Sequence, residues 1–256
     1  MCSIGSTDPT AGAGLFADAA VYARMGVRAT FVVAGVTAQN SSGVSGVQTL
    51  SAAAIAAQLR AVWKQVRPDA VRIGLLPDAA ASVAIAQFLG LLRRRPPVVL
   101  DPVIASTSGY GFAGPKEIAA LRTLLGVATI ATPNAHEAAE LSAMSVRTAD
   151  DAERAALALA ASSKCAVLVT GGHLRDGDRV VDVLARGRRA TRYSAVRLAR
   201  DVRGTGCLLA AAIAASLARG DDLETAIARA RSFVRRAIAS ARPLGNGRPQ
   251  FTAGRS

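Results

Sequence analysis

The stretch Asp201-Val-Arg-Gly-Thr-Gly-Cys-Leu-Leu-Ala-Ala-Ala-Ile-Ala-Ala215 joins a glycine turn directly to a run of apolar, helix-forming residues. From this run we predict a helix over 205–218. The turn leaves the first backbone N–H groups of that helix without intrahelical partners, so 204–207 is a ready anion site. A thiol at such a place has its pKa lowered toward the thiolate. A plain turn with Cys207 as a small core residue is an equally good interpretation.

Strand and helix patterns alternate along the rest of the chain, with short connections of Gly, Pro and Asp. The predicted strands are 30–36, 71–74, 97–101, 128–132 and 166–170, with an antiparallel hairpin over 179–184 and 189–194. The predicted helices are 51–66, 79–92, 116–125, 134–141, 149–161, 205–218 and 223–239. This alternation implies an α/β fold, a mostly parallel sheet covered by helices, with ligands at the carboxyl ends of the strands.

Length and composition indicate one globular domain over residues 1–256, because 51% of the 256 residues are hydrophobic and 19% are charged. A Gly/Pro-rich tail over 243–256 is a candidate for disorder. The three cysteines form no CxxC pair, which argues against a disulfide framework or a zinc site and suits a reducing cytosol. The start lacks the basic segment of a secretory signal, and the longest apolar run falls short of the roughly 20 residues that cross a bilayer. We therefore expect a cytoplasmic protein with no membrane partner.

The net charge of +13 raises the question of nucleic-acid binding. Of the 31 basic residues 28 are arginines, scattered along the chain, with dense clusters only at 93–95 and 186–192. The clusters lack the interleaved aromatic residues on which bases stack. We therefore expect no nucleic-acid partner, although a positive surface helps to attract phosphorylated ligands.

Two further segments carry polar groups next to predicted strands. The loop Gly5-Ser-Thr-Asp-Pro-Thr-Ala-Gly-Ala-Gly14 is glycine-rich but matches neither a Walker A loop nor a dinucleotide fingerprint, and Asp18 follows one turn into the next helix. Asn134 and Glu137 have the spacing of a helix capping box. The same amide and carboxylate also suit a hydrated Mg²⁺, which keeps waters and takes few protein ligands. One pair of residues can serve both purposes.

Gln39 and Asp101 also come at or after strands. A glutamine amide offers donors and acceptors together, which matches a ring nitrogen and the exocyclic amine of an aminopyrimidine. A loop glutamine facing water is the alternative for Gln39. Asp101 closes an apolar run typical of a buried strand. Both positions are candidates for a binding site by their place alone.

Seven blocks, in order and spanning nearly the whole chain, carry a family resemblance: Gly5-Ser-Thr-Asp-Pro-Thr-Ala-Gly-Ala-Gly14, Thr37-Ala-Gln-Asn40, Ile73-Gly-Leu-Leu76, Leu100-Asp-Pro-Val103, Thr132-Pro-Asn-Ala-His-Glu137, Gly171-Gly-His173 and Gly204-Thr-Gly-Cys207. They resemble hydroxymethylpyrimidine/phosphomethylpyrimidine kinases of thiamine biosynthesis, which belong to the ribokinase-like superfamily. The resemblance implies a three-layer α/β/α fold with a small antiparallel hairpin. It also implies a homodimer that binds ATP and Mg²⁺ and phosphorylates 4-amino-5-hydroxymethyl-2-methylpyrimidine, then its monophosphate.

The resemblance also assigns roles to residues. The catalytic anion hole would be Gly204, Thr205, Gly206 and Cys207. The substrate-binding residues would be Gln39, Gly5 and Asp18. The ATP-binding residues would be Thr170, Gly172 and Arg203. The metal region would consist of Asp101, Asn134 and Glu137, the last two acting through water.

Three departures from the family pattern temper this expectation. Thr170 stands where relatives usually have a lysine that faces the ATP phosphates, and Arg200 or Arg203 is the candidate to replace that cation. Arg203 and Leu208 replace a histidine and a threonine that usually flank Gly-Thr-Gly-Cys. The first strand, counted as 1–4, is unusually short. A pyridoxal-type kinase, and a pyrimidine-phosphate sensor with weakened catalysis, are therefore the alternative functions.

Overall fold

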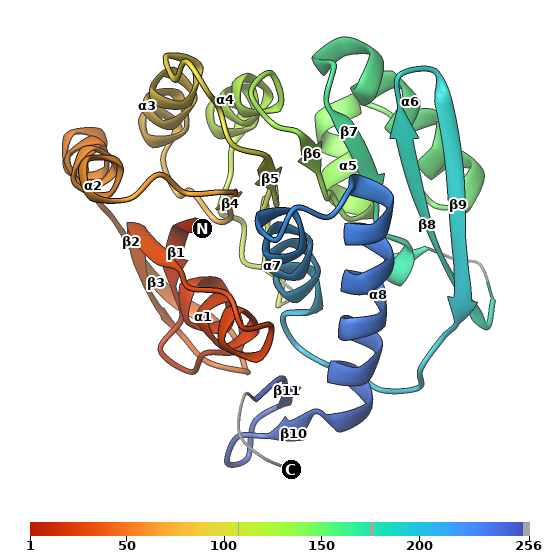
Figure 1. The fold of residues 1–256 in the computed structure, drawn as a ribbon. Coiled ribbons are helices and arrows are strands. Elements are labelled where there is room, and N and C mark those ends of the chain that lie inside the picture. The colour runs from red at the N-terminus through yellow and green to blue at the C-terminus, as the bar shows by residue number, and fades with distance from the viewer. Residues whose placement is uncertain (107, 175–176, 253–256) are drawn as a thin grey trace.

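A nine-stranded sheet runs through the middle of the computed structural model, which describes residues 1–106, 108–174 and 177–252 (Figure 1). Its order is β3-β2-β1-β4-β5-β6-β7-β8-β9. The strands are β1 (Cys2–Thr7), β2 (Thr30–Gln39), β3 (Val44–Thr49), β4 (Val71–Ile73), β5 (Val98–Leu100), β6 (Ile130–Ala131), β7 (Ala166–Val169), β8 (Arg179–Arg186) and β9 (Arg189–Val196).

Six neighbouring strands pair in parallel with one another: β2, β1, β4, β5, β6 and β7. The remaining three strands, β3, β8 and β9, pair antiparallel. β4, β5 and β7 are buried along their whole length, as expected for parallel strands covered on both faces. The predicted hairpin is confirmed as β8 and β9, joined through Gly187 in the left-handed region (φ +60°). β3 was absent from the sequence prediction.

Helices cover both faces of the sheet and enclose two separate apolar clusters (Figure 1). One face carries α2 (Ala52–Gln65), α3 (Ala79–Gly90), α4 (Pro115–Leu125), α5 (Ala135–Ser142) and α6 (Ala149–Ser163). The other carries α1 (Gly14–Arg24), α7 (Thr205–Ala218) and α8 (Leu223–Ser240). The predicted three-layer α/β/α class is therefore confirmed.

α7 lies at the centre of its layer, against α1 and α8 and over the middle of the sheet (Figure 1). Every residue from Leu208 to Leu217 is buried. A helix that is apolar on all sides needs such a fully enclosed position. The packing therefore fixes where the first turn of α7 ends up, at the carboxyl edge of the parallel strands.

The first strand is longer than the sequence analysis expected. β1 runs through Gly5 and on to Thr7, paired with β2 along its length and with β4 at Cys2, Ser3 and Ile4. It is therefore a central strand of six residues, and the expectation of an unusually short one is wrong.

The end of the chain is ordered as far as the structure describes it. β10 (Arg242–Pro243) pairs antiparallel with β11 (Pro249–Gln250), and the rings of Phe251 and Phe233 pack edge to face at 5.4 Å. The expectation of disorder is therefore wrong for 243–252, and 253–256 lie outside the described residues. Within the described parts of the chain, no helix is both long and apolar enough to cross a bilayer.

Candidate active site

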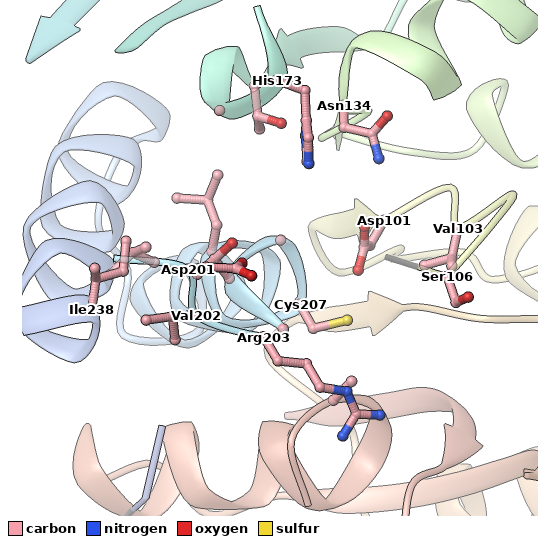
Figure 2. Close-up of a pocket in the computed structure, with 18 of the residues that line it drawn as sticks. Asp101, Val103, Ser106, Asn134, His173, Asp201, Val202, Arg203, Cys207 and Ile238 are labelled. Atoms are coloured by element: carbon pink, nitrogen blue, oxygen red, sulfur yellow. The ribbon is translucent and has the colours of Figure 1, made fainter. Parts of the chain in front are cut away.

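A cavity of about 400 Å³ opens at the carboxyl ends of the parallel strands, where the first turn of α7 meets them. In Figure 2 the sulfur of Cys207 points into a space that also receives the side chains of Asp101 and Asn134. All the residues that the resemblance assigned line this cavity except Gly5 and Asp18. The parallel sheet thus brings together segments that are distant in the sequence, as such folds do at their strand ends.

The first turn of α7 has the backbone geometry that the predicted anion cradle requires. Gly204 is the residue before the helix and has φ +80°, and a Cβ added there would lie 1.9 Å from the carbonyl oxygen of Gly12. Only glycine therefore fits at this position. The next backbone N–H groups, of Thr205, Gly206 and Cys207, belong to the first turn and have no earlier turn to bond with. All three residues line the cavity at the positive end of the helix dipole, which suits a phosphate group.

Cys207 does not behave as a low-pKa thiol. Its side chain is half-buried, and burial, with Asp101 as the next contributor, raises the pKa of the Cys207 thiol to about 12. These effects outweigh Arg72, which lowers it. Of the two interpretations that the sequence left open for Cys207, the thiol of lowered pKa is therefore contradicted, and the side chain is a neutral S–H donor at pH 7.

Beneath the cavity lies Arg72, a fully buried charge that the sequence analysis did not select. Its guanidinium contacts Asp101 Oδ2 at 2.6 Å and Asp18 Oδ2 at 3.1 Å. Gly74 gives it room, since a Cβ on that residue would lie 1.9 Å from Arg72 Nη1. The sequence signal was an arginine inside a buried three-residue strand, because a charge in that position needs ionic partners.

Asp18 and Gly5, which the resemblance assigned to the substrate, lie outside the lining of this cavity. Asp18 is completely buried, and its Oδ2 accepts from Ser3 Oγ at 2.5 Å as well as from Arg72. Burial raises the pKa of the Asp18 carboxyl to about 6, against the opposing effect of Arg72. Gly5 is part of β1 inside the sheet. Asp18 is connected to the cavity through Arg72, whose other carboxylate partner, Asp101, lines it.

Asp101, Asn134 and Glu137 are brought together at one side of the cavity. The capping box is present, because Asn134 N donates to Glu137 Oε2 at 2.8 Å and Glu137 N donates to Asn134 Oδ1 at 3.0 Å. Burial, and then the like charge of Asp101, raise the pKa of the Glu137 carboxyl to about 8. Two carboxyl groups that disfavour each other's charge at the edge of a cavity are suited to a divalent cation, which would favour the charged form of both.

Direct coordination by many protein ligands is not available there. In the part of the chain that the structure describes, no three His, Cys, Asp or Glu side chains are close enough together to hold a metal ion. This donor set, two carboxylates and an amide oxygen, fits a hydrated Mg²⁺ that retains several of its waters.

Arg203 lies on the Gln39 side of the cavity, away from the position expected for an ATP ligand. Its Nη2 contacts Gln39 Oε1 and Asp8 Oδ2, each at 2.9 Å, and its Nη1 donates to Thr10 Oγ1 at 2.9 Å. Arg200 does not replace the missing lysine either, because its guanidinium donates to the carbonyls of Ala239 and Ala241. Neither arginine therefore serves as the cation beside Thr170.

Arg197 is a cation that contacts the Thr170 end of the cavity. Its Nη1 donates to the carbonyl of Gly172 at 2.7 Å and its Nη2 to that of Leu174 at 3.1 Å. Thr170 itself is bridged to Asn134, so the expected nucleotide and metal residues adjoin each other. Sequence reasoning missed Arg197 because nothing distinguishes it among 28 arginines.

Comparisons with known proteins agree with this geometry. A family model described as phosphomethylpyrimidine kinase matches residues 8–251. The hydroxymethylpyrimidine/phosphomethylpyrimidine kinase of Rhizobium meliloti (strain 1021) is 39% identical, over 96% of this chain and 93% of that protein. The protein of the same name from Streptomyces coelicolor is 38% identical, over 96% of this chain and 91% of that protein.

Solved structures of kinases are also similar to this chain. The phosphomethylpyrimidine kinase of Clostridium difficile 630 is 31% identical with a TM-score of 0.81, over 93% of this chain and 98% of that one. An ADP complex of Bacillus subtilis pyridoxal kinase is 29% identical with a TM-score of 0.88, over 98% and 96%. This chain belongs to the phosphomethylpyrimidine kinase family.

Proposed function

We propose that this protein transfers the γ-phosphoryl group of ATP to the hydroxymethyl group of 4-amino-5-hydroxymethyl-2-methylpyrimidine, and then phosphorylates the resulting monophosphate. The strongest support for this proposal comes from the first turn of α7. It directs unpartnered backbone N–H groups and a neutral thiol into a cavity that is also lined by Asp101, Glu137 and Gln39. The names of the two bacterial relatives at 38–39% identity support the same substrate.

The cradle suits phosphoryl transfer because that reaction asks mainly for positioning and charge stabilisation. The backbone N–H groups of Thr205 and Gly206 lie where negative charge accumulates on the transferring group. The Cys207 S–H adds a donor close to the same oxygens. As Cys207 is neutral, it holds its own proton and does not act as a ready base.

Mg²⁺ is the metal that we propose for the Asp101 side of the cavity. Glu137 and Asn134 would hold it through water, and Asp101 would face it with its Oδ1, since Oδ2 is bonded to Arg72. The ion would supply positive charge that neutralises the phosphate oxygens. Around it, Arg72 fixes the Asp101 carboxylate and the capping box fixes Asn134 and Glu137.

The nucleotide is proposed to lie at the Thr170 and Gly172 end of the cavity, beside Arg197. The relative from Bacillus subtilis was solved as an ADP complex, which supports nucleotide binding by this fold. We also propose that the chain acts in the cytoplasm as a homodimer. Three unpaired cysteines suit a reducing compartment, and sedimentation velocity measures the oligomeric state.

The decisive experiment is a kinase assay with purified protein, Mg²⁺-ATP and each pyrimidine in turn. We expect product from both, and Cys207→Ala should lower kcat by about 100-fold because it removes a donor to the transferring group. Cys207→Ser keeps a donor and should retain more activity. An unchanged kcat in Cys207→Ala would remove the thiol from the mechanism.

Pyridoxal is the second candidate substrate, because the pyridoxal kinase relative is 29% identical over nearly all of both chains. A higher kcat/KM for pyridoxal than for the pyrimidine would reverse the choice. Binding of the pyrimidine phosphate without any turnover would instead favour a sensor. Thr170→Lys then tests whether a missing charge is the cause, since it should restore turnover.

A further inference from the structure

Gln39 is held in one orientation by a charged neighbour. It is the last residue of β2 and lines the cavity, and its Oε1 accepts from Arg203 Nη2 at 2.9 Å. The two ends of a side-chain amide are told apart only by their hydrogen-bond partners. A guanidinium carries donors and no acceptor, so the Gln39 atom that faces Arg203 is the oxygen.

Arg203 cannot easily turn away from this contact. Asp8 Oδ2 contacts the same Nη2 at 2.9 Å, and Thr10 Oγ1 accepts from Nη1 at 2.9 Å. The backbone N–H of Arg203 donates to the Pro249 carbonyl at 2.9 Å. The side chain is only 9% exposed. Gly12 passes so close that an added Cβ would lie 2.6 Å from Arg203 Nη1. The guanidinium is therefore fixed from several directions.

The amide nitrogen of Gln39 remains for the ligand. Among the described residues none accepts a hydrogen bond from Gln39 Nε2, while the oxygen already has a charge-assisted partner. A ligand in this cavity thus meets an amide nitrogen whose two N–H donors are free, and an amide oxygen with one lone pair already bonded to Arg203. The sequence analysis expected a donor and an acceptor together, and Arg203 weakens the acceptor.

We propose that Arg203 makes Gln39 a donor that selects a heterocycle by an unprotonated ring nitrogen and not by its exocyclic amine. This rests on the proposed function and deepens it, because 4-amino-5-hydroxymethyl-2-methylpyrimidine has two ring nitrogens that accept and one amine that donates. Arg203 is then a positioning residue for specificity, and Gln39 is the residue that contacts the substrate.

Calorimetry without ATP tests the proposal on the intact protein. The ligands are the parent pyrimidine, two pyridine analogues in which one ring nitrogen at a time is replaced by C–H, and an analogue with hydrogen in place of the amine. We expect one pyridine analogue to bind wild-type protein about 10-fold more weakly than the parent. Gln39→Met should abolish that difference, and it should leave the cost of removing the amine unchanged.

Two further variants separate the oxygen from the nitrogen of the amide. Gln39→Glu keeps a partner for Arg203 but has no N–H, so it too should lose the preference for the ring nitrogen. Arg203→Met frees the amide to turn, and the variant should begin to distinguish the amine from hydrogen. Gln48→Met is the matched control, because Gln48 is exposed on β3 outside the cavity lining.

The possible outcomes are distinct. If Gln39→Met abolishes the cost of removing the amine and not that of a ring nitrogen, the second lone pair of the oxygen does the recognition and the proposal falls. If wild-type protein binds the parent pyrimidine and the Gln39 variants bind every ligand as wild type does, the proposal falls while the proposed function stands. If it does not bind the pyrimidine at all, both fall. If Arg203→Met does not fold, the affinities of Gln39→Met and Gln39→Glu still test the proposal.

Discussion

At Cys207 the folded environment shifts the pKa of the thiol in the direction opposite to the effect of the helix dipole. A cysteine at the start of a helix has its thiolate favoured by the helix dipole, which was one of the two interpretations that the sequence left open. The structure adds two influences that act the other way, burial and the nearby Asp101 carboxylate, and they raise the pKa of the thiol to about 12. The residue therefore stays protonated throughout the physiological pH range.

The alkylation rate of Cys207 by iodoacetamide should reveal this pKa. The thiolate is the reactive form, so the rate should rise about tenfold per pH unit from pH 7 to pH 10 without levelling off. Mass spectrometry of the Cys207 peptide separates it from Cys2 and Cys165, which are buried. A plateau below pH 8 would show a stabilised thiolate and contradict the assignment.

Arg72 is expected to hold the floor of the site together. Arg72→Met leaves Asp101 and Asp18 buried without their cation, and the free energy of unfolding should fall by about 3–5 kcal/mol. Urea unfolding followed by circular dichroism measures this change. The double variant Arg72→Met with Asp18→Asn should recover part of the loss, because it removes one of the two unpaired carboxylates. A change below about 0.5 kcal/mol in Arg72→Met would contradict the proposed role.

At the scale of elements, the beginning of α7 depends on a backbone contact. Gly204→Ala must meet both a positive φ and the Gly12 carbonyl, so we expect it to lower the free energy of unfolding by about 2 kcal/mol or more. Gly206→Ala is the matched control two residues on, where an added Cβ meets open space. Its stability should stay within about 1 kcal/mol of wild type. Thermal unfolding of both variants checks the contrast.

Elements with strong local patterns were predictable from the sequence, and those that depend on distant contacts were not. The α7 boundaries agree with the predicted 205–218, and Ser51 caps α2 by accepting from Ala54 N. β3 was missed because its antiparallel pairing to β2 carries no apolar run of its own. β11 was missed because it is two residues long and is held by partners far away in the chain.

The same division applies to the candidate site. Residues in short motifs, such as Asn134 with Glu137 and the 204–207 turn, could be found from their spacing and resemblance. Arg72 and Arg197 could not be assigned, because their partners come from other strands and loops and their type is common throughout this chain. The pKa of Cys207 was beyond sequence reasoning for a related reason, since burial is a property of the folded chain.

On the scale of the whole molecule, the two ends of the sequence meet beside the substrate pocket. Gln250 Nε2 donates to the Thr10 carbonyl at 2.6 Å, and Gln250 is 3% exposed. Gln250→Ala should therefore loosen the loop that holds Arg203, and raise KM for the pyrimidine about 3- to 10-fold with kcat changed less than 2-fold. Steady-state kinetics tests this against Gln48→Ala. A fall in kcat at constant KM would place the effect on the phosphate cradle instead.

The contact between Gln250 and Thr10 also has a consequence for synthesis. Thr10 and Gln250 are 240 residues apart in the sequence, so during synthesis the wall around Arg203 stays unfinished until the Gln250 strand has emerged from the ribosome. A growing chain that has already folded its sheet would still lack this wall of the cavity.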